Sequence, residues 1–155
     1  MKYKLLVSLC IILALLFTGV SVYAIYGKSV TSHVKVIQSG GGGGGGNVLL
    51  EFYQDENCTQ VCNLVEWGDV TQGALQTRDN MFYVKNIGTL STIITGTHSL
   101  PVGVGTFTVQ FKQANNWVVS RSLNIGQSCG TQGVITILQT SPLGDCSFNI
   151  IVEGQ

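Results

Sequence analysis

Charged residues are scarce in this chain, and so are proline and histidine. Charged residues make up 10% of its 155 residues, with two prolines and two histidines, where an ordinary globular domain has about 25% charged residues. The chain is not basic enough for a nucleic-acid footprint. It also lacks the charge typical of helical bundles and disordered tails. Glycine is abundant instead, at 20 residues, beside many Val, Ile, Thr, Ser and Asn, a composition that suits an all-β protein.

Residues 1–24 predict a secretory signal peptide. Lys2 and Lys4 precede an apolar stretch, Leu5 to Phe17, and Val22-Tyr23-Ala24 resembles a cleavage site. The alternative is an uncleaved membrane anchor over Leu5 to Ala24, since a bilayer core needs about 20 mostly apolar residues. Cleavage would remove two of eight cations and leave all eight acids, so that the mature chain carries a small negative charge. We therefore expect a secreted protein, located in an extracellular filament or at the cell surface.

The cysteine count predicts disulfides rather than a metal site. One cysteine, Cys10, leaves with the signal, and an even number remains in an exported chain. These are Cys58, Cys62, Cys129 and Cys146. The pairing is open. A local Cys58–Cys62 bridge would leave Cys129–Cys146 as the other, and a Cys-x3-Cys spacing without a nearby histidine argues against a metal. Asn57-Cys58-Thr59 fits the N-glycosylation motif, which makes Asn57 a candidate acceptor.

Short alternating segments separated by turn residues follow from residue 47 onward. No segment sustains a helical period, so the pattern predicts a jelly-roll-like β-sandwich over residues 47–155. We expect the first two strands to form a hairpin. The predicted strands are 47–54, 60–68, 79–88, 90–100, 106–113, 117–126, 133–140 and 146–154.

The alternation within these strands also predicts the hydrophobic core. In residues 79–88, Phe82, Val84 and Asn86 share one face. The whole predicted core is Leu50, Phe52, Val65, Trp67, Phe82, Val84, Ile94, Phe107, Val109, Phe111, Val118, Leu123, Ile135, Ile137, Phe148, Ile150 and Val152. Trp67-Gly68 is interpreted as a buried ring followed by a turn glycine, and Asn86-Ile87-Gly88 as a turn.

No constellation of residues points to catalysis or to a cofactor. The histidines, His33 and His98, have no nucleophile motif around them, and the sequence contains neither G-x-S-x-G nor H-E-x-x-H. The glycine run precedes a strand rather than a helix, so it is not a phosphate-binding loop. Asp55 and Glu56 are interpreted as solvated acids in a turn, or as a weak Ca²⁺ turn. We expect no enzyme, no metal site and no cofactor.

A strand-like segment, residues 25–39, stands ahead of seven consecutive glycines. Val30, Val34 and Val36 share one face, while Thr31 and Lys35 lie on the other. The segment could return to its own domain, serve as a plain spacer, or complete the sheet of a neighbouring subunit by β-strand addition. We favour donation, which repeated without closure gives a filament. The glycines that would then act as the hinge are Gly40, Gly41, Gly42, Gly43, Gly44, Gly45 and Gly46.

Three stretches carry a family resemblance. "VEWGDVTQG" (65–73), "FYVKNIGTLSTIIT" (82–95) and the closing "CSFNIIVEG" (146–154) resemble secreted archaeal β-sandwich proteins related to the TasA/camelysin family of biofilm-matrix fibre proteins and to archaeal bundling pilins. The resemblance implies a jelly-roll subunit, exported by a cleaved signal, that polymerises with copies of itself through an N-terminal donor strand. The alternative is a monomeric cell-surface binding or adhesion module, carried on a glycine spacer from an uncleaved anchor.

Overall fold

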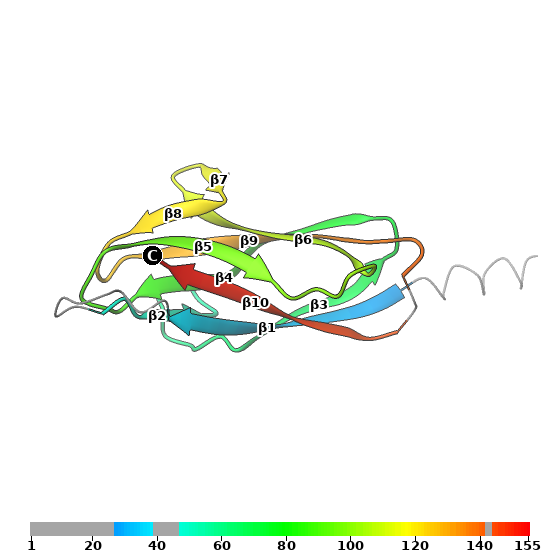
Figure 1. Ribbon diagram of the computed structural model, residues 1–155, viewed down its shortest axis with the longest axis horizontal. Helices are drawn as coiled ribbons and strands as arrows, with labels where there is room; N and C mark the ends of the chain where they lie inside the picture. Colours follow the sequence, from blue (N-terminus) through cyan, green and yellow to red (C-terminus); the bar gives the residue numbers. More distant parts are fainter. Residues whose placement is uncertain (1–26, 39–46, 142–143) are drawn as a thin grey trace, which may run out of the picture.

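The computed structural model describes residues 47–141 and 144–155 and the backbone pairing of residues 27–38. This part of the chain contains strands and no helix, so the all-β prediction is confirmed (Figure 1). The strands form two five-stranded sheets around one hydrophobic core, consistent with a β-sandwich. No helix in the described ranges is long and apolar enough to cross a membrane. The predicted signal peptide lies outside these ranges.

The first sheet, sheet A, has the strand order β3-β1-β10-β5-β8. The second, sheet B, has the order β2-β4-β9-β6-β7. The bounds in sheet A are β3 Leu64–Thr71, β1 Gly27–Gln38, β10 Cys146–Gly154, β5 Thr92–His98 and β8 Ser120–Leu123. Those in sheet B are β2 Leu50–Tyr53, β4 Leu75–Asn86, β9 Ser128–Ile137, β6 Gly105–Gln113 and β7 Asn116–Val118.

Buried residues alternate with exposed ones along these strands, as a pleated strand with one face toward the core requires. Phe82, Val84 and Phe111 are among the fully buried side chains. Every predicted core residue is buried except Val118, which is partly buried against the core. Residues that the alternation did not predict, among them Cys62, Val70, Met81 and Cys129, also belong to the core.

The pairing of the first strands of the body corrects the sequence prediction. β2 pairs with β4 in sheet B, whereas β3 pairs with β1 in sheet A. The two therefore do not form the expected hairpin, and only an isolated bridge between Tyr53 and Val61 joins their segments. The predicted strand 117–126 is likewise two short strands, because the chain crosses from sheet B to sheet A at Val119 between β7 and β8.

Trp67 and Gly68 belong to a bulge rather than to a turn. Trp67 is buried, as predicted, but Gly68 lies within β3 and has φ +69°. The register against β1 shifts there, with Val30 opposite Gly68 and Thr31 opposite Glu66. Such a bulge inserts one extra residue and bends the strand, and glycine is the residue that adopts a positive φ without steric cost.

Aromatic rings fill the space between the sheets beneath this bulge. Phe107 of sheet B makes edge contacts with Trp67 and with Phe148 of sheet A, at ring-centre distances of 5.7 Å and 4.9 Å. Gly133 makes room for the indole, because a Cβ there would come within 2.6 Å of Trp67 and 2.3 Å of the Met81 sulfur. Phe107 and Trp67 thus link β6 to the strand that flanks β1.

Candidate assembly site

The N-terminal strand occupies an interior position in sheet A. β1 runs parallel to β10, from Val30 opposite Cys146 to Gln38 opposite Gly154. On its other side it runs antiparallel to β3, from Gly27 opposite Thr71 to His33 opposite Leu64. Figure 1 shows β1 beside β10, and β3 pairs with its other side over residues 27–33. In this structure the predicted donor segment therefore pairs within its own chain.

The predicted donor positions align with the buried residues of β10. Val34 is in register with Ile150, and Val36 with Val152. Ile150 and Val152 are both 0% exposed. Lys35, predicted to lie on the other face, is in register with the half-buried Ile151. The register thus agrees with the predicted alternation of the segment, while the predicted hinge, residues 40–46, lies outside the described residues.

The body offers a slot that fits one strand. β3 pairs with residues 27–33 of β1 and β10 with residues 30–38, so β1 lies between the two strands over residues 30–33. Adjacent strands lie about 4.8 Å apart, which places β3 and β10 about 10 Å apart there. Core residues line this slot. Val65, Trp67 and Val70 come from β3, and Phe148, Ile150 and Val152 from β10. Sequence reasoning did not predict that β3 and β10 are the neighbours of β1, because strand alternation does not reveal which strands are adjacent.

The side chain of Asn86, the last residue of β4, makes hydrogen bonds to three backbone groups. It is fully buried, and its Nδ2 donates hydrogen bonds to the carbonyl oxygens of Leu90 at 2.7 Å and Leu123 at 3.2 Å. Its Oδ1 accepts the N–H of Gly88 at 3.0 Å. Asn86 therefore ties the β4–β5 turn to β8 across the two sheets. The predicted turn at Asn86 to Gly88 has this physical basis.

Cys58, Cys62, Cys129 and Cys146 are free thiols in this structure, so neither predicted disulfide is formed in it. Cys129 pairs with Val84 near the start of β9, whereas Cys146 lies level with Gly68 across β1. Beyond Gly68, β3 continues toward Gly73, whose N–H donates a hydrogen bond to the carbonyl oxygen of Ile137 at the far end of β9. Cys129 and Cys146 are thus separated by nearly the length of β9, roughly 25 Å. A disulfide requires Cα atoms within about 7 Å.

Thiol reactivity should reflect these positions. Burial raises the pKa of the Cys129 thiol to about 11 and also raises the pKa of Cys62. Because the thiolate is the reactive form, we expect the half-buried Cys58 and Cys146 to react with an aromatic disulfide reagent at pH 8 at least tenfold faster than Cys62 and Cys129. Mass mapping of the labelled sites measures this. Protein without any free thiol before reduction would instead support the two sequence-predicted disulfides.

The loop that carries the glycosylation motif is organised by Asp55. Asn57 is exposed, and Asp55 accepts hydrogen bonds from the backbone N–H groups of Thr59 and Gln60 and from the Thr59 hydroxyl. Partial desolvation raises the pKa of Asp55, but the bonds from Gln60 and Thr59 outweigh it and leave the pKa below its usual value. Asp55 is thus a turn-forming carboxylate, and no cluster of three or more metal-ligating side chains occurs in the described ranges.

This loop should loosen in acid. A carboxyl whose folded pKa is lowered contributes stability above its unfolded pKa, and that contribution is lost as the pH falls through the folded value. We expect the amide protons of Thr59 and Gln60 to lose protection from hydrogen exchange below about pH 4, while those of the β4–β9 ladder keep it. Asp55→Asn should reduce the same protection at neutral pH. Unchanged exchange at Thr59 and Gln60 in that variant would contradict this role for Asp55.

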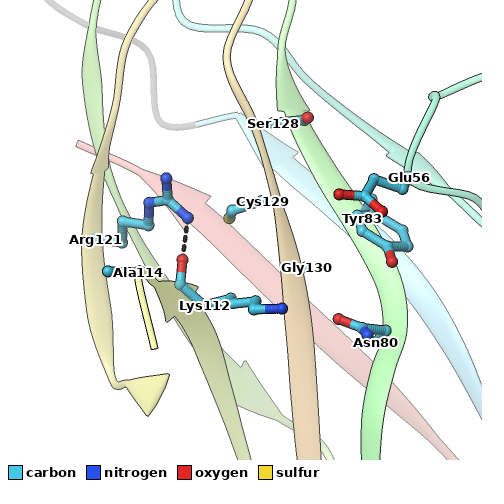
Figure 2. A pocket seen from close by; sticks show the side chains of 9 residues that line it. All are labelled: Glu56, Asn80, Tyr83, Lys112, Ala114, Arg121, Ser128, Cys129 and Gly130. Atoms are coloured by element: carbon cyan, nitrogen blue, oxygen red, sulfur yellow. Dashed lines mark hydrogen bonds between the residues drawn. The ribbon is translucent and has the colours of Figure 1, made fainter. Parts of the chain in front are cut away.

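A polar hollow of about 230 Å³ lies over Gly130 on sheet B (Figure 2). The Lys112 side chain points across β9 toward Asn80, and Glu56 and Tyr83 stand on the other side. Arg121 donates a hydrogen bond to the Lys112 carbonyl. A Cβ at Gly130 would come within 2.5 Å of the Asn80 side-chain oxygen, so a larger residue here would displace the Asn80 amide. The lining carries the positive side chains of Lys112 and Arg121 and the negative side chain of Glu56.

Comparison with known proteins gives no relative for this chain: no protein-family model matches it, and neither does any curated protein.

Proposed function

We propose that this protein is an extracellular structural subunit that polymerises into a pilus or biofilm-matrix filament by donor-strand complementation. The observation that supports the proposal is the position of β1. It is an interior strand of sheet A, paired on both sides by strands of the body, yet the sequence attaches it through seven consecutive glycines. A strand supplied by a neighbouring subunit would make the same contacts.

The topology of the body is compatible with the jelly-roll part of this proposal. Consecutive strands from β2 to β6 alternate between the two sheets, and β8, β9 and β10 do so again. Each crossing leaves strands of one sheet separated in sequence, which is typical of jelly rolls and other double-sheet folds. In the proposed filament, the position of β1 between β3 and β10 is filled by the strand of a neighbouring subunit.

The energetics favour exchange once copies are concentrated. A subunit's own β1 and a β1 donated by a neighbour make equivalent contacts with the body. The equilibrium between the closed monomer and the exchanged form therefore depends on linker strain and protein concentration, as in domain swapping. Exchange must first break the ladders on both sides of β1, which slows it. We therefore expect denaturant below the unfolding midpoint to accelerate assembly of residues 25–155 at least tenfold, as measured by light scattering. A rate that only falls with denaturant would argue against strand release.

Deletion of the strand tests the proposal. Residues 25–155 should give filaments in negative-stain electron microscopy, and a chain that begins at Asn47 should not. A peptide of residues 25–39 added to the shorter chain should bind it and raise its thermal midpoint, while the same peptide with Val34→Asp should not. Filaments from the chain that begins at Asn47 would contradict the proposal.

One observation favours the alternative, a monomeric cell-surface binding or adhesion module. β1 pairs within its own chain here, as it would in a monomer, and the hollow over Gly130 offers polar groups of both charges. On this alternative, residues 25–155 stay monomeric and the chain on cells keeps residues 1–24. Intact mass of the protein isolated from cells distinguishes the two.

A further inference from the structure

Sheet B has an edge that is only partly covered. β9 pairs with β6 from Gly105 to Phe111, but β7 on the other side covers only Phe111–Gln113. The chain then crosses at Val119 to sheet A, where β8 pairs with Thr92–Thr95 of β5. No strand within the described ranges covers residues 105–110 of β6 on the side away from β9.

The backbone groups on this uncovered side can be assigned. The Leu138 N–H donates a hydrogen bond to the Val104 carbonyl oxygen at 2.9 Å, so the backbone polar groups of Val104 point toward β9. Bonding direction alternates along an antiparallel strand. Thr106, Thr108 and Gln110 therefore bond toward β9, and the N–H and C=O groups of Gly105, Phe107 and Val109 point away from it.

A groove of about 330 Å³ lies beside these groups. Its walls include Phe107 and Val109 of β6, residues 96–98 of β5 and the crossover residue Val119. Val119 is 64% exposed although it is apolar. The groove is thus a strand edge flanked by apolar surface, the kind of surface to which another strand adds.

Charge distinguishes this edge from the other edges of the two sheets. Residues 105–111, GTFTVQF, carry no charge and no proline. Edge strands β2, β3 and β8 carry charges, with Glu51 on β2, Glu66 and Asp69 on β3 and Arg121 on β8, whereas β7, which continues the edge beside β6, is the uncharged segment NWV. Charges on an edge strand oppose pairing with a second copy of the same strand, because like charges meet across the ladder. The uncovered part of β6 lacks this protection.

We propose that two copies of this protein pair edge to edge through β6, antiparallel, about a two-fold axis at Phe107. The N–H and C=O groups that point away from β9 belong to Gly105, Phe107 and Val109. In the proposed pair, Gly105 of one copy therefore lies opposite Val109 of the other. Thr106 then lies opposite Thr108 on the exposed face, a favourable cross-strand pair. The two copies of sheet B become one continuous sheet. A second copy is the partner that fits this edge, because the uncharged segment is complementary to itself.

This pairing is independent of the donor strand, since β6 is in sheet B and β1 in sheet A. A single strand pair buries less than the roughly 1,200 Å² of a stable interface, so two isolated molecules associate weakly. Repeated along two filaments, the same contact would hold them side by side through multivalency. It therefore supplies a lateral contact, in addition to the axial one of the proposed function.

A charge design tests the register. Thr106 and Thr108 are both exposed, so Thr106→Lys/Thr108→Lys and its matched control Thr106→Lys/Thr108→Glu should both fold. In the proposed register the first places Lys opposite Lys twice, and the second places Lys opposite Glu. Sedimentation of the monomeric fraction of residues 25–155, over a concentration series, measures dimerisation. Thermal unfolding checks that all three proteins are folded.

We expect the wild-type protein and the Lys/Glu variant to dimerise, and the Lys/Lys variant to dimerise at least tenfold more weakly. In micrographs, Lys/Lys filaments should keep their length but lose side-by-side contacts, which separates this proposal from the donor-strand proposal. Absence of dimers in the wild-type protein would overturn the pairing, as would equal association of the two variants.

Discussion

The Val34→Asp variant of residues 25–155 should form no filaments. Val34 is in register with Ile150, whose side chain is 0% exposed, and the sequence alternation places Val34 on the same face as Val30 and Val36. On the predicted alternation, an aspartate at this position would bring a carboxylate to the core face of sheet A. Burying an unpaired charge costs several kcal/mol, so we expect the free energy of unfolding to fall by about 3 kcal/mol or more.

Lys35→Asp is the matched control for this substitution. It introduces the same side chain one residue further along β1, opposite the half-buried Ile151, on the face predicted to lie away from the core. We expect it to assemble and to change stability by less than about 1 kcal/mol. Electron microscopy and urea denaturation measure the two effects. Filaments of ordinary abundance from Val34→Asp would show that this face of β1 is not what assembly requires.

Replacing Asn86 by alanine should destabilise the monomer by about 2–4 kcal/mol. The Asn86 side chain is fully buried and makes three hydrogen bonds, to Leu90, Leu123 and Gly88. Alanine removes the donors for two carbonyl oxygens and the acceptor for one N–H, in a site from which water is excluded. Chemical denaturation at pH 7 gives the difference. A loss below about 0.5 kcal/mol would mean that the network contributes little.

Asn86→Asp separates the donor from the acceptor role. Aspartate can still accept the Gly88 N–H but, when ionised, cannot donate to the Leu90 and Leu123 carbonyls. Burial among carbonyl oxygens should raise its pKa, so its stability is highest below the unfolded pKa of about 4 and is lost as the pH rises through the folded value. We expect the deficit relative to wild type to be larger at pH 7 than at pH 4. A deficit independent of pH would contradict this reasoning.

Strand alternation predicted the core well, because it depends only on neighbouring residues. Residues 106–113 alternate cleanly, and β6 spans Gly105–Gln113, one residue longer than predicted. β4 begins at Leu75, earlier than predicted, because the polar residues Gln76, Thr77 and Arg78 pair with β9 although they show no apolar alternation. Pairing with β9 makes these residues a strand, although their own sequence pattern does not indicate one.

Partners across the sheets could not be predicted in the same way. The expected hairpin of the first two body strands failed, because β2 and β3 join different sheets. Gly68 was expected in a turn, yet the same positive φ serves a bulge within β3. β3, β1 and β10 are adjacent in sheet A although they are far apart in sequence. Residues 25–39 were predicted as a strand from their valines, but the place of residues 27–38 in sheet A could be found only from the structure.

The most direct measurement asks whether β1 of one chain lies beside β10 of another. Lys35 and Ile151 are in register, so Lys35→Cys and Ile151→Cys can be placed on separate, differently tagged chains that also carry Cys58→Ser and Cys146→Ser. After assembly of the mixture and mild oxidation, we predict disulfide-linked heterodimers containing both tags. Filaments without such heterodimers, together with an intrachain bond when both cysteines are on one chain, would contradict donor-strand assembly.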